Sequence, residues 1–291
     1  QGAYEVKLVT VVIPCFNSGV TLPQTIESVK AQTYTNIEII VVDDGSTDEL
    51  TIECIKCLNG VRIIRQENCG LPAARNVGFS EARGEYILPL DADDWIEPET
   101  LSHLLIALEE SPHASFAFSH ITLEGEKKGV LKKNYNFFEQ LFLNQMPYCL
   151  LLRRSVWSEI GGYDESMSRG YEDWEFNIRL GSFGHHGIVV PLPLFHYRVM
   201  STGMLLSRSN KLHAELWREI RYKHTSLYGF SSLFELWLKW RNRAATYPLM
   251  AYFFWLGLEV ALPSKIFNWL FRKLGKLSHS QRESRRSQCV E

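Results

Sequence analysis

Apolar residues in the first part of the chain form short continuous runs, separated by stretches with helical spacing. The runs at residues 7–14 and 37–42 have the length of buried strands, and shorter runs follow at 61–65 and 86–90. Strands that are apolar throughout and alternate with helices are typical of a parallel sheet covered on both faces. The pattern therefore predicts an α/β fold, with a mostly parallel sheet flanked by helices.

The pattern changes near residue 206, after which long helical stretches with aromatic stripes replace the strands. Turn residues interrupt these stretches at Gly229, Pro248 and Pro263. We therefore expect two parts, a sheet domain over residues 1–206 and a helical C-terminal segment over residues 207–291. The chain has 291 residues, more than the ~250 at which single cores tend to stop growing.

Charge is divided unevenly between the two parts. Residues 1–200 contain 16 Lys and Arg against 27 Asp and Glu, whereas residues 201–291 contain 15 against 6. The whole chain has a net charge of −2, so we expect no nucleic acid partner. The C-terminal part also holds five of the eight tryptophans, and basic aromatic helices of this kind lie in bilayer interfaces.

Two interpretations of the C-terminal segment stay open at this point. Residues 207–276 either make a peripheral membrane contact or form a helical lid that packs on the sheet domain or on another subunit. A membrane-spanning helix is not indicated, because the longest uncharged run, residues 244–258, is shorter than the ~20 residues that a span needs.

Six scattered cysteines and the lack of a leader pattern predict a cytoplasmic protein, placed at the inner face of the cell membrane if the membrane contact exists. Cys54 and Cys57 have the spacing of half a zinc site. Because the chain offers no second pair, we expect them to pack in a helix.

A dense acidic group follows the predicted strand at 86–90. Asp91, Asp93 and Asp94 occupy three of four consecutive positions, so their mutual repulsion favours a bound cation. Oxygen ligands of this type suit Mn²⁺ or Mg²⁺, which bridge carboxylates to a diphosphate. The alternative interpretation is an acidic turn that caps the next helix.

Asp43 and Asp44 follow the strand at 37–42, where a carboxylate can accept a hydrogen bond from a nucleotide base or ribose. The alternative is a helix N-cap, a role that Thr47 or Asp48 also suits. Because α/β sheets bind ligands at the carboxyl ends of their strands, we expect both acidic clusters to lie at one edge of the sheet.

Four segments in this order resemble the family 2 inverting glycosyltransferases, of the kind that build bacterial cell-surface polysaccharides. They are residues 11–17 (VVIPCFN), 41–48 (VVDDGSTD), 68–76 (NCGLPAARN) and 84–94 (GEYILPLDADD). The resemblance extends over residues 7–200 and implies a Rossmann-like fold of the GT-A type, with residues 1–206 as the nucleotide-sugar-binding and catalytic domain.

The resemblance also implies roles for individual residues around a nucleotide-sugar donor. The base and ribose would be bound by Pro14, Phe16, Asn17 and Asp44. Arg75 would lie near the nucleotide, and Asp91 and Asp93 would form the D-x-D motif that meets the metal and the diphosphate. Mn²⁺ or Mg²⁺ would be the cofactor.

Three later segments resemble the acceptor half of the family. Residues 161–165 (GGYDE) resemble its acceptor-side loop, and Glu172 and Asp173 match its E-D motif, in which the aspartate is the general base. The alternative for Asp173 is a helix N-terminal carboxylate that the helix dipole stabilises. In residues 195–198 (FHYR), His196 would complete the metal shell and Arg198 would face the diphosphate.

The sequence thus predicts a metal-dependent inverting hexosyltransferase. It would move a sugar from a UDP-sugar to a hydroxyl of a glycan or a lipid-linked acceptor. A sugar nucleotidyltransferase is one alternative, but residues 14–20 lack the basic, glycine-rich loop that it needs. A catalytically degenerate sugar-nucleotide-binding protein is another, although both acidic motifs are present. Dehydrogenases and phosphate-loop NTPases are excluded, because their glycine motifs are missing.

Overall fold

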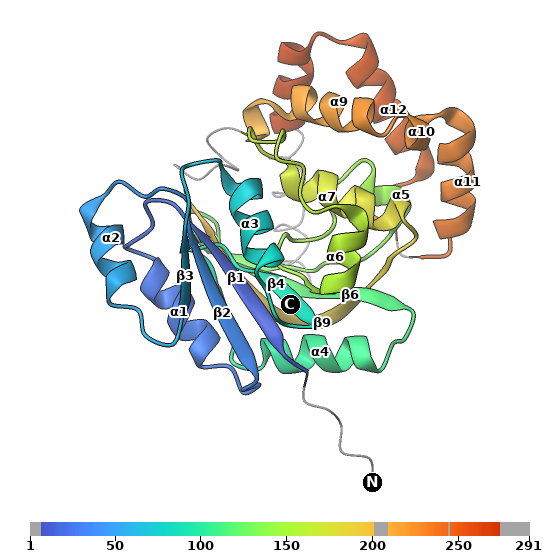
Figure 1. Cartoon of the computed structure of the whole chain (residues 1–291). Helices are drawn as coiled ribbons and strands as arrows, with labels where there is room; N and C mark the ends of the chain where they lie inside the picture. The colour runs from blue at the N-terminus through green and yellow to red at the C-terminus, as the bar shows by residue number, and fades with distance from the viewer. Residues whose placement is uncertain (1–6, 201–208, 244, 274–291) are drawn as a thin grey trace, which may run out of the picture.

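A nine-stranded sheet lies at the centre of the molecule, with helices on both of its faces (Figure 1). The computed structural model describes residues 7–200, 209–243 and 245–273. The strand order is β3-β2-β1-β4-β8-β6-β9-β5, and β7 pairs with β6. The strands are β1 (Val9–Cys15), β2 (Ile37–Asp43), β3 (Arg62–Arg65), β4 (Tyr86–Pro89), β5 (Trp95–Ile96), β6 (Ala114–Gly125), β7 (Gly129–Leu131), β8 (Leu151–Arg153) and β9 (His186–Val199).

The N-terminal half of the sheet is parallel, as predicted. β1 pairs in parallel with β2 and β4, and β2 pairs in parallel with β3. Three helices form the crossovers, namely α1 (Leu22–Lys30), α2 (Glu49–Lys56) and α3 (Leu71–Ser80). Asp48 is the N-cap of α2, because its carboxylate accepts a hydrogen bond of 2.8 Å from the backbone N–H of Thr51.

The second half of the sheet is mixed. β6 and β9 are parallel to each other, whereas β8 is antiparallel to both β4 and β6, β5 is antiparallel to β9, and β7 is antiparallel to β6. The α/β sheet with flanking helices is confirmed, and its parallel pairing is concentrated where crossover helices connect successive strands. β5, β7 and β8 are only two or three residues long and complete the second half at its edges and centre.

Two hydrophobic cores hold the layers together. Helices α1, α2 and α4 (Thr100–Glu109) cover one face of the sheet. The other face is covered by α3, α5 (Phe137–Gln140), α6 (Arg154–Ile160) and α7 (Glu172–Ser182). Val11 and Val12 of β1 point into opposite cores and both are fully buried, which explains why this strand is apolar throughout.

The C-terminal helices pack on the outer side of the second core (Figure 1). After a short 3₁₀ turn at Ser209–Lys211 they are α9 (His213–Lys223), α10 (Thr225–Tyr228), α11 (Phe230–Trp240) and α12 (Leu249–Ala261), and residues 264–273 are also helical. Trp217, Trp240, Tyr252 and Phe267 are buried in the same cluster as side chains of α5 and α7. This is the packing on the sheet domain that the sequence left as one alternative.

The predicted boundary at residue 206 lies outside the described residues, as do residues 207–208 and 274–276 of the proposed membrane segment. In the part of the chain that the structure describes, no helix has the length and apolar character needed to cross a bilayer.

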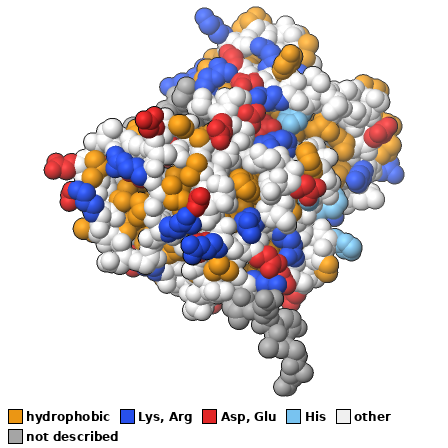
Figure 2. Space-filling model, viewed as in Figure 1, with side chains coloured by type: hydrophobic (Ala, Val, Ile, Leu, Met, Phe, Trp, Pro, Cys, Tyr) orange, Lys and Arg blue, Asp and Glu red, His pale blue; other side chains and the backbone are white. Residues whose placement is uncertain are grey.

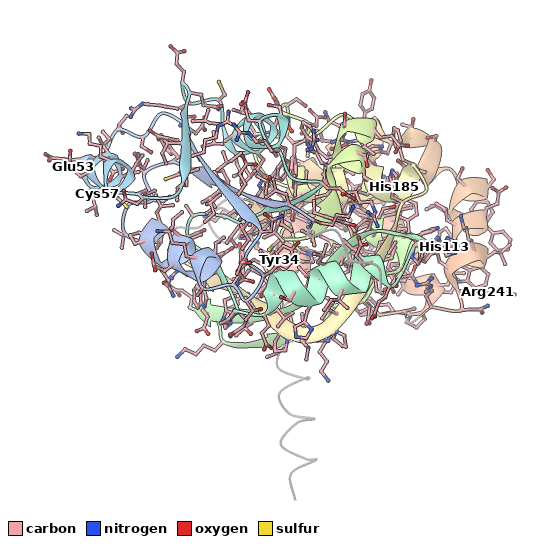
Figure 3. The ribbon with its side chains drawn as sticks, turned by 60° about the horizontal axis from the view of Figure 1, so that its bottom comes forward. Tyr34, Glu53, Cys57, His113, His185 and Arg241 are labelled. Atoms are coloured by element: carbon pink, nitrogen blue, oxygen red, sulfur yellow. The ribbon has the colours of Figure 1, made fainter. Side chains whose placement is uncertain are left out.

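Cys54 is half-buried against the core and Cys57 is exposed, and neither forms a disulfide. Figure 3 shows Cys57 and Glu53 on the outer side of α2. The only group of metal-ligating side chains among the described residues is Asp91, Asp93 and Asp94, so the pair does not build a metal site there.

Candidate active site

A pocket of about 480 Å³ opens at the carboxyl ends of β1, β2 and β4. Six of the predicted site residues line it, namely Pro14, Phe16, Asp44, Asp91, Asp93 and Arg198. They come from segments far apart in the sequence, and the parallel register of the strands brings their ends to one edge. The pocket therefore lies at the carboxyl-terminal edge of the sheet, where we predicted a ligand from the sequence.

Asp44 and Phe16 form the end of the pocket nearest β1 and β2. The Asp44 carboxylate is buried and accepts hydrogen bonds from the Gln66 side chain and from the backbone N–H groups of Cys69 and Gly70, at 2.7 to 2.9 Å. These bonds hold the loop before α3 and fix the carboxylate at the wall of the pocket. The Phe16 ring is 47% exposed, which leaves an aromatic face free for stacking.

Asn17 lies beside the pocket without lining it. Its side-chain oxygen accepts hydrogen bonds from the backbone N–H groups of Thr47 and Asp48, at 2.8 and 3.2 Å. Its own backbone is in the left-handed region, with φ 50°, a conformation that asparagine tolerates better than most residues. Asn17 thus ties the loop after β1 to the loop after β2.

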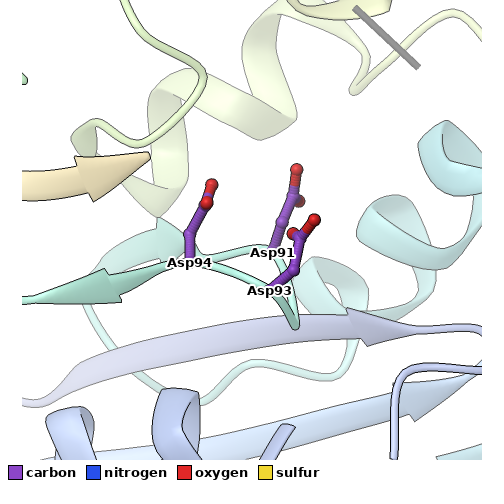
Figure 4. A group of neighbouring side chains, drawn as sticks. All are labelled: Asp91, Asp93 and Asp94. Atoms are coloured by element: carbon purple, nitrogen blue, oxygen red, sulfur yellow. The ribbon is translucent and has the colours of Figure 1, made fainter. Parts of the chain in front are cut away.

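Asp91 and Asp93 present their carboxylates to the same space, and the Asp94 carboxylate lies apart from them (Figure 4). One oxygen from each of the three lies within 4.8 Å of the others. Burial, followed by the charge of Asp91, raises the pKa of Asp93 to about 6. A cation bound beside Asp93 would lower the pKa of Asp93 and offset the repulsion between the Asp91 and Asp93 carboxylates.

The two oxygens of Asp94 are already used within the protein. One accepts from the Tyr148 hydroxyl at 2.5 Å and the other from the backbone N–H of Arg198 at 2.7 Å. The same Tyr148 hydroxyl accepts from the backbone N–H of Asp91 at 3.0 Å. Asp94 therefore fastens the acidic loop to β9. Asp91, whose carboxylate also pairs with Arg75, and Asp93 line the pocket and face the space that an ion could occupy.

A second pocket of about 280 Å³ adjoins the first, and both are lined by Leu71, Asp91 and Tyr197. Glu172 and Asp173 lie in the wall of the second pocket, at the first two positions of α7. The acidic pair after β4 and the E-D pair of α7 thus face two cavities that meet at Asp91.

Arg75 connects the two acidic groups. Its guanidinium is buried and forms ion pairs with Asp91 at 2.8 Å and with Glu172 at 2.9 Å. The rings of Tyr148 and Tyr163 lie against it at 4.9 and 5.2 Å. Arg75 lines the second pocket and not the first, so it lies between the acidic pairs, away from the position expected for the base and ribose.

Burial dominates the ionisation of the E-D pair. It raises the pKa of Glu172 to about 7, against the opposing effect of the Arg75 charge. It also raises the pKa of Asp173, again opposed by Arg75 and by a hydrogen bond that the Asn144 amide donates to the Asp173 carboxylate at 2.9 Å. The other Asp173 oxygen accepts from the backbone N–H of Trp174.

Tyr171, immediately before this pair, has a left-handed backbone with φ 65°. Such strain in a non-glycine residue persists only where its surroundings hold it. Here the Tyr171 hydroxyl lies 2.8 Å from Nδ1 of His213 on α9, and the Tyr171 ring packs edge-on against Trp174. The C-terminal helices therefore help to fix the start of α7.

Of the two residues singled out in the segment 195–198, Arg198 lies at the first pocket and His196 does not. Arg198 lines the first pocket, and its Nε donates to the backbone carbonyl of Asp93 at 2.9 Å. His196 lines neither pocket; its Nε2 lies 2.7 Å from Glu97, and its ring stacks on Trp95 at 4.9 Å. The structure thus does not group His196 with Asp91 and Asp93. The Trp95 ring contacts both His196 and the Arg198 guanidinium, which lies 4.9 Å from the ring centre.

The sequence model of the family described as Glycosyl transferase family 2 matches residues 10–168, which is more than half of the chain. The chain belongs to glycosyl transferase family 2. Among curated relatives, it is 34% identical over 175 residues to glycosyltransferase GlyG of Streptococcus pneumoniae, covering 59% of this chain and 52% of GlyG. It is 32% identical over 194 residues to glycosyltransferase GlyA of the same organism, covering 61% of this chain and 27% of GlyA. The chain thus spans about half of one relative and a quarter of the other.

Solved structures of S. aureus TarS share the fold. TarS superposes with a TM-score of 0.62 at 18% identity, covering 84% of this chain and 44% of TarS. TarS 1–349 in complex with UDP-GlcNAc superposes with a TM-score of 0.59 at 20% identity, covering 73% of this chain and 65% of that chain. These likenesses confirm the predicted GT-A fold with its additional C-terminal helices.

Several residues of the site had no signal in the sequence. Asn144 and Tyr148 lie in an irregular segment outside the recognised motifs, and His213 and Phe271 reach the second pocket from the C-terminal helices. Tyr197 could have been found, because it lies between the two residues already singled out at 196 and 198. It lines both pockets.

Proposed function

We propose that this family 2 member transfers a sugar from a UDP-sugar to a hydroxyl group of a glycan or a lipid-linked acceptor, with inversion at the anomeric carbon. The observation that carries the proposal is the meeting of two pockets at Asp91. One pocket presents the acidic pair, and the other presents Asp173. The likeness to TarS, which was solved in complex with UDP-GlcNAc, supports a nucleotide-sugar as the donor.

The first pocket suits a nucleoside diphosphate with a divalent ion. Asp91 and Asp93 would hold Mn²⁺ or Mg²⁺, because their adjacent oxygens are hard ligands. Burial and the charge of Asp91 raise the pKa of Asp93, and a bound cation would offset both effects. A bound ion of this kind would neutralise charge on the departing diphosphate. Arg198 lines the same pocket and would add a second positive charge. Phe16 and Asp44 would meet the base and ribose.

Asp173 is the group that would activate the acceptor. Its carboxylate would take the proton from the acceptor hydroxyl as the acceptor oxygen bonds to the anomeric carbon. The bond from that carbon to the diphosphate oxygen breaks in the same displacement, so the configuration inverts. Asn144 holds the carboxylate in place, and Arg75 holds Glu172 beside it.

We expect Asp93→Asn to lower the affinity for a UDP-sugar in Mn²⁺ to the value that wild type shows without metal, because the ion would lose one of two carboxylate ligands. Isothermal titration with UDP-GlcNAc, with Mn²⁺ and with chelator, measures this. GDP- and dTDP-sugars, titrated in parallel, test the choice of base. Glu53→Gln changes an exposed carboxylate on α2 and is the control. Equal affinity in Mn²⁺ and in chelator for wild type would remove the metal from the proposal.

The turnover number should fall as the pH is lowered, and it should do so at a higher pH than the ordinary pKa of an aspartate would give. Asp173 accepts a proton only when it is ionised, and burial raises its pKa, so activity is lost as the pH falls through that raised value. A profile of kcat at saturating donor measures the acidic limb. Asn144→Ala removes a bond that favours the ionised form and should move the limb to higher pH. A profile without an acidic limb contradicts the role of Asp173.

A further inference from the structure

Helix α12 turns apolar side chains outward along its whole length. Met250, Phe254 and Val260 are 74%, 67% and 71% exposed, and the small residues Gly257 and Ala261 continue the same face. Glu259 is the one charged residue of the helix, and it is fully buried, paired with Arg218 and Arg221 of α9. A surface helix is usually polar on its outward face, whereas α12 is apolar on its outward face as well as on the face that packs on the core.

Helix α11 extends this surface. Phe230 and Phe234 are 77% and 43% exposed, and the Phe230 ring lies 6.0 Å from the ring of Phe253 on α12. We call the surface formed by Phe230, Phe234, Met250, Phe254 and Val260 the outer apolar face. Figure 2 shows hydrophobic side chains at the surface of the C-terminal helices, with Lys and Arg side chains beside them. Contiguous exposed apolar surface of this kind marks an interaction site.

Positive charge predominates in the segment that contains the outer apolar face. Residues 229–273 contain six Lys and Arg against two Glu, and one of these, Glu259, is buried in the ion pairs with α9. Arg241 lies at the outer end of α11, as Figure 3 shows. Its guanidinium lies over the Trp237 ring at 5.7 Å, and the Lys273 ammonium lies over the Trp269 ring at 5.9 Å. Tryptophan beside basic residues is characteristic of segments at a bilayer interface.

The charges distinguish a bilayer from a second copy of the chain. A two-fold contact through the outer apolar face would bring the basic rims of both copies together, which costs energy. A bilayer with anionic headgroups offers the opposite charge to the rim and an apolar interior to Phe254 and Met250. Since no described helix is long and apolar enough to span, α12 would lie in the plane of the interface.

We propose that the outer apolar face docks this protein on a bilayer that carries anionic headgroups. The buried face of α12 belongs to the same hydrophobic cluster as Trp217 and Phe142, and Phe142 lines the second pocket. Docking therefore holds that pocket at a fixed orientation to the lipid surface. The inference goes beyond the proposed reaction, because lipid binding requires neither donor nor turnover.

Flotation of the full chain with vesicles tests the proposal, using phosphatidylcholine alone and phosphatidylcholine mixed with phosphatidylglycerol. Wild type should bind the anionic vesicles. The double variant Met250→Glu and Phe254→Glu should lose about tenfold or more in affinity, since it places charge on the docking face. Ile106→Glu changes a 53% exposed apolar residue on α4 and should bind as wild type does.

A second variant separates headgroup charge from apolar insertion. Lys239→Gln, Arg241→Gln and Arg243→Gln together should remove the preference for anionic over neutral vesicles. The proposal is overturned if wild type binds neither vesicle or if the double variant floats as well as wild type does. It is also overturned if, without lipid, sedimentation shows wild type as a dimer that the double variant dissociates, because the face would then join two copies.

Discussion

Replacing Asp173 with Asn is expected to reduce the turnover number by about 10²- to 10⁴-fold, the usual contribution of a positioned general base. The amide has the size of the carboxylate, and its one oxygen can still accept one of the two hydrogen bonds that Asn144 and the Trp174 backbone N–H donate, so the shape of the pocket wall changes little. It cannot take the proton of an acceptor hydroxyl. Steady-state transfer from UDP-GlcNAc, followed by release of UDP, measures the loss.

Donor affinity provides the control for this variant. Asp173 lines the second pocket but not the first, so Asp173→Asn should leave the affinity for UDP-GlcNAc in Mn²⁺ within about twofold of wild type. Turnover close to that of wild type would remove Asp173 as the base. A parallel loss of donor affinity would instead show that the substitution disturbs Asp91 through Arg75.

Arg75→Met is expected to lower the free energy of unfolding by about 3–5 kcal/mol at neutral pH, the cost of breaking a buried ion pair by removing one partner. Methionine fills much of the arginine volume, so the change isolates the charge. Asp91 and Glu172 would then face each other in a buried site without their shared cation. Urea unfolding of wild type and variant measures the difference.

The pH dependence of this loss distinguishes charge from packing. Arg75 lowers the pKa of Glu172, so without Arg75 that pKa rises further. Lowering the pH then protonates Glu172 in the folded state, and the deficit should shrink. Arg62→Met is the matched control, because its ion pair with Glu81 is largely exposed and worth about 1 kcal/mol or less. A deficit that stays constant between neutral and acidic pH would assign the effect to packing.

The sequence was sufficient for the N-terminal half of the fold. β1 and β2 are apolar at consecutive positions because both faces are covered, and this leaves a pattern that can be recognised without the structure. The polar clusters at their carboxyl ends then follow from topology alone, so Asp44 and Asp91 could be placed on one pocket in advance. The helix-capping role of Asp48 is equally local.

Long-range pairing limited what could be predicted further along the chain. β6 pairs with β9 across about seventy residues, and β5 has two residues, too few to show a period. His196 illustrates the consequence, since only the pairing with Trp95 shows which neighbours its ring meets. Arg75 was recognised by its motif, but nothing local indicated that it joins two acidic groups 16 and 97 positions away.

Aromatic composition likewise could not divide the C-terminal residues between core and surface. Trp217 and Trp240 are buried, whereas Phe230 and Phe254 are exposed, although all lie in helices of similar composition. A helical period shows that residues share a face. The contact with α5 and α7 decides which face is covered.

The burial of Trp217 makes the core of the sheet domain depend on the C-terminal helices. Its indole N–H donates to the Leu141 carbonyl at 3.0 Å, and its ring packs on Phe142. A shortened protein ending before α9 would uncover Phe142 and Trp174, release Tyr171 from His213, and open the second cavity to water on one side. Such a fragment would be prone to aggregate, so engineering of its donor or acceptor preference should begin from the chain with its terminal helices intact.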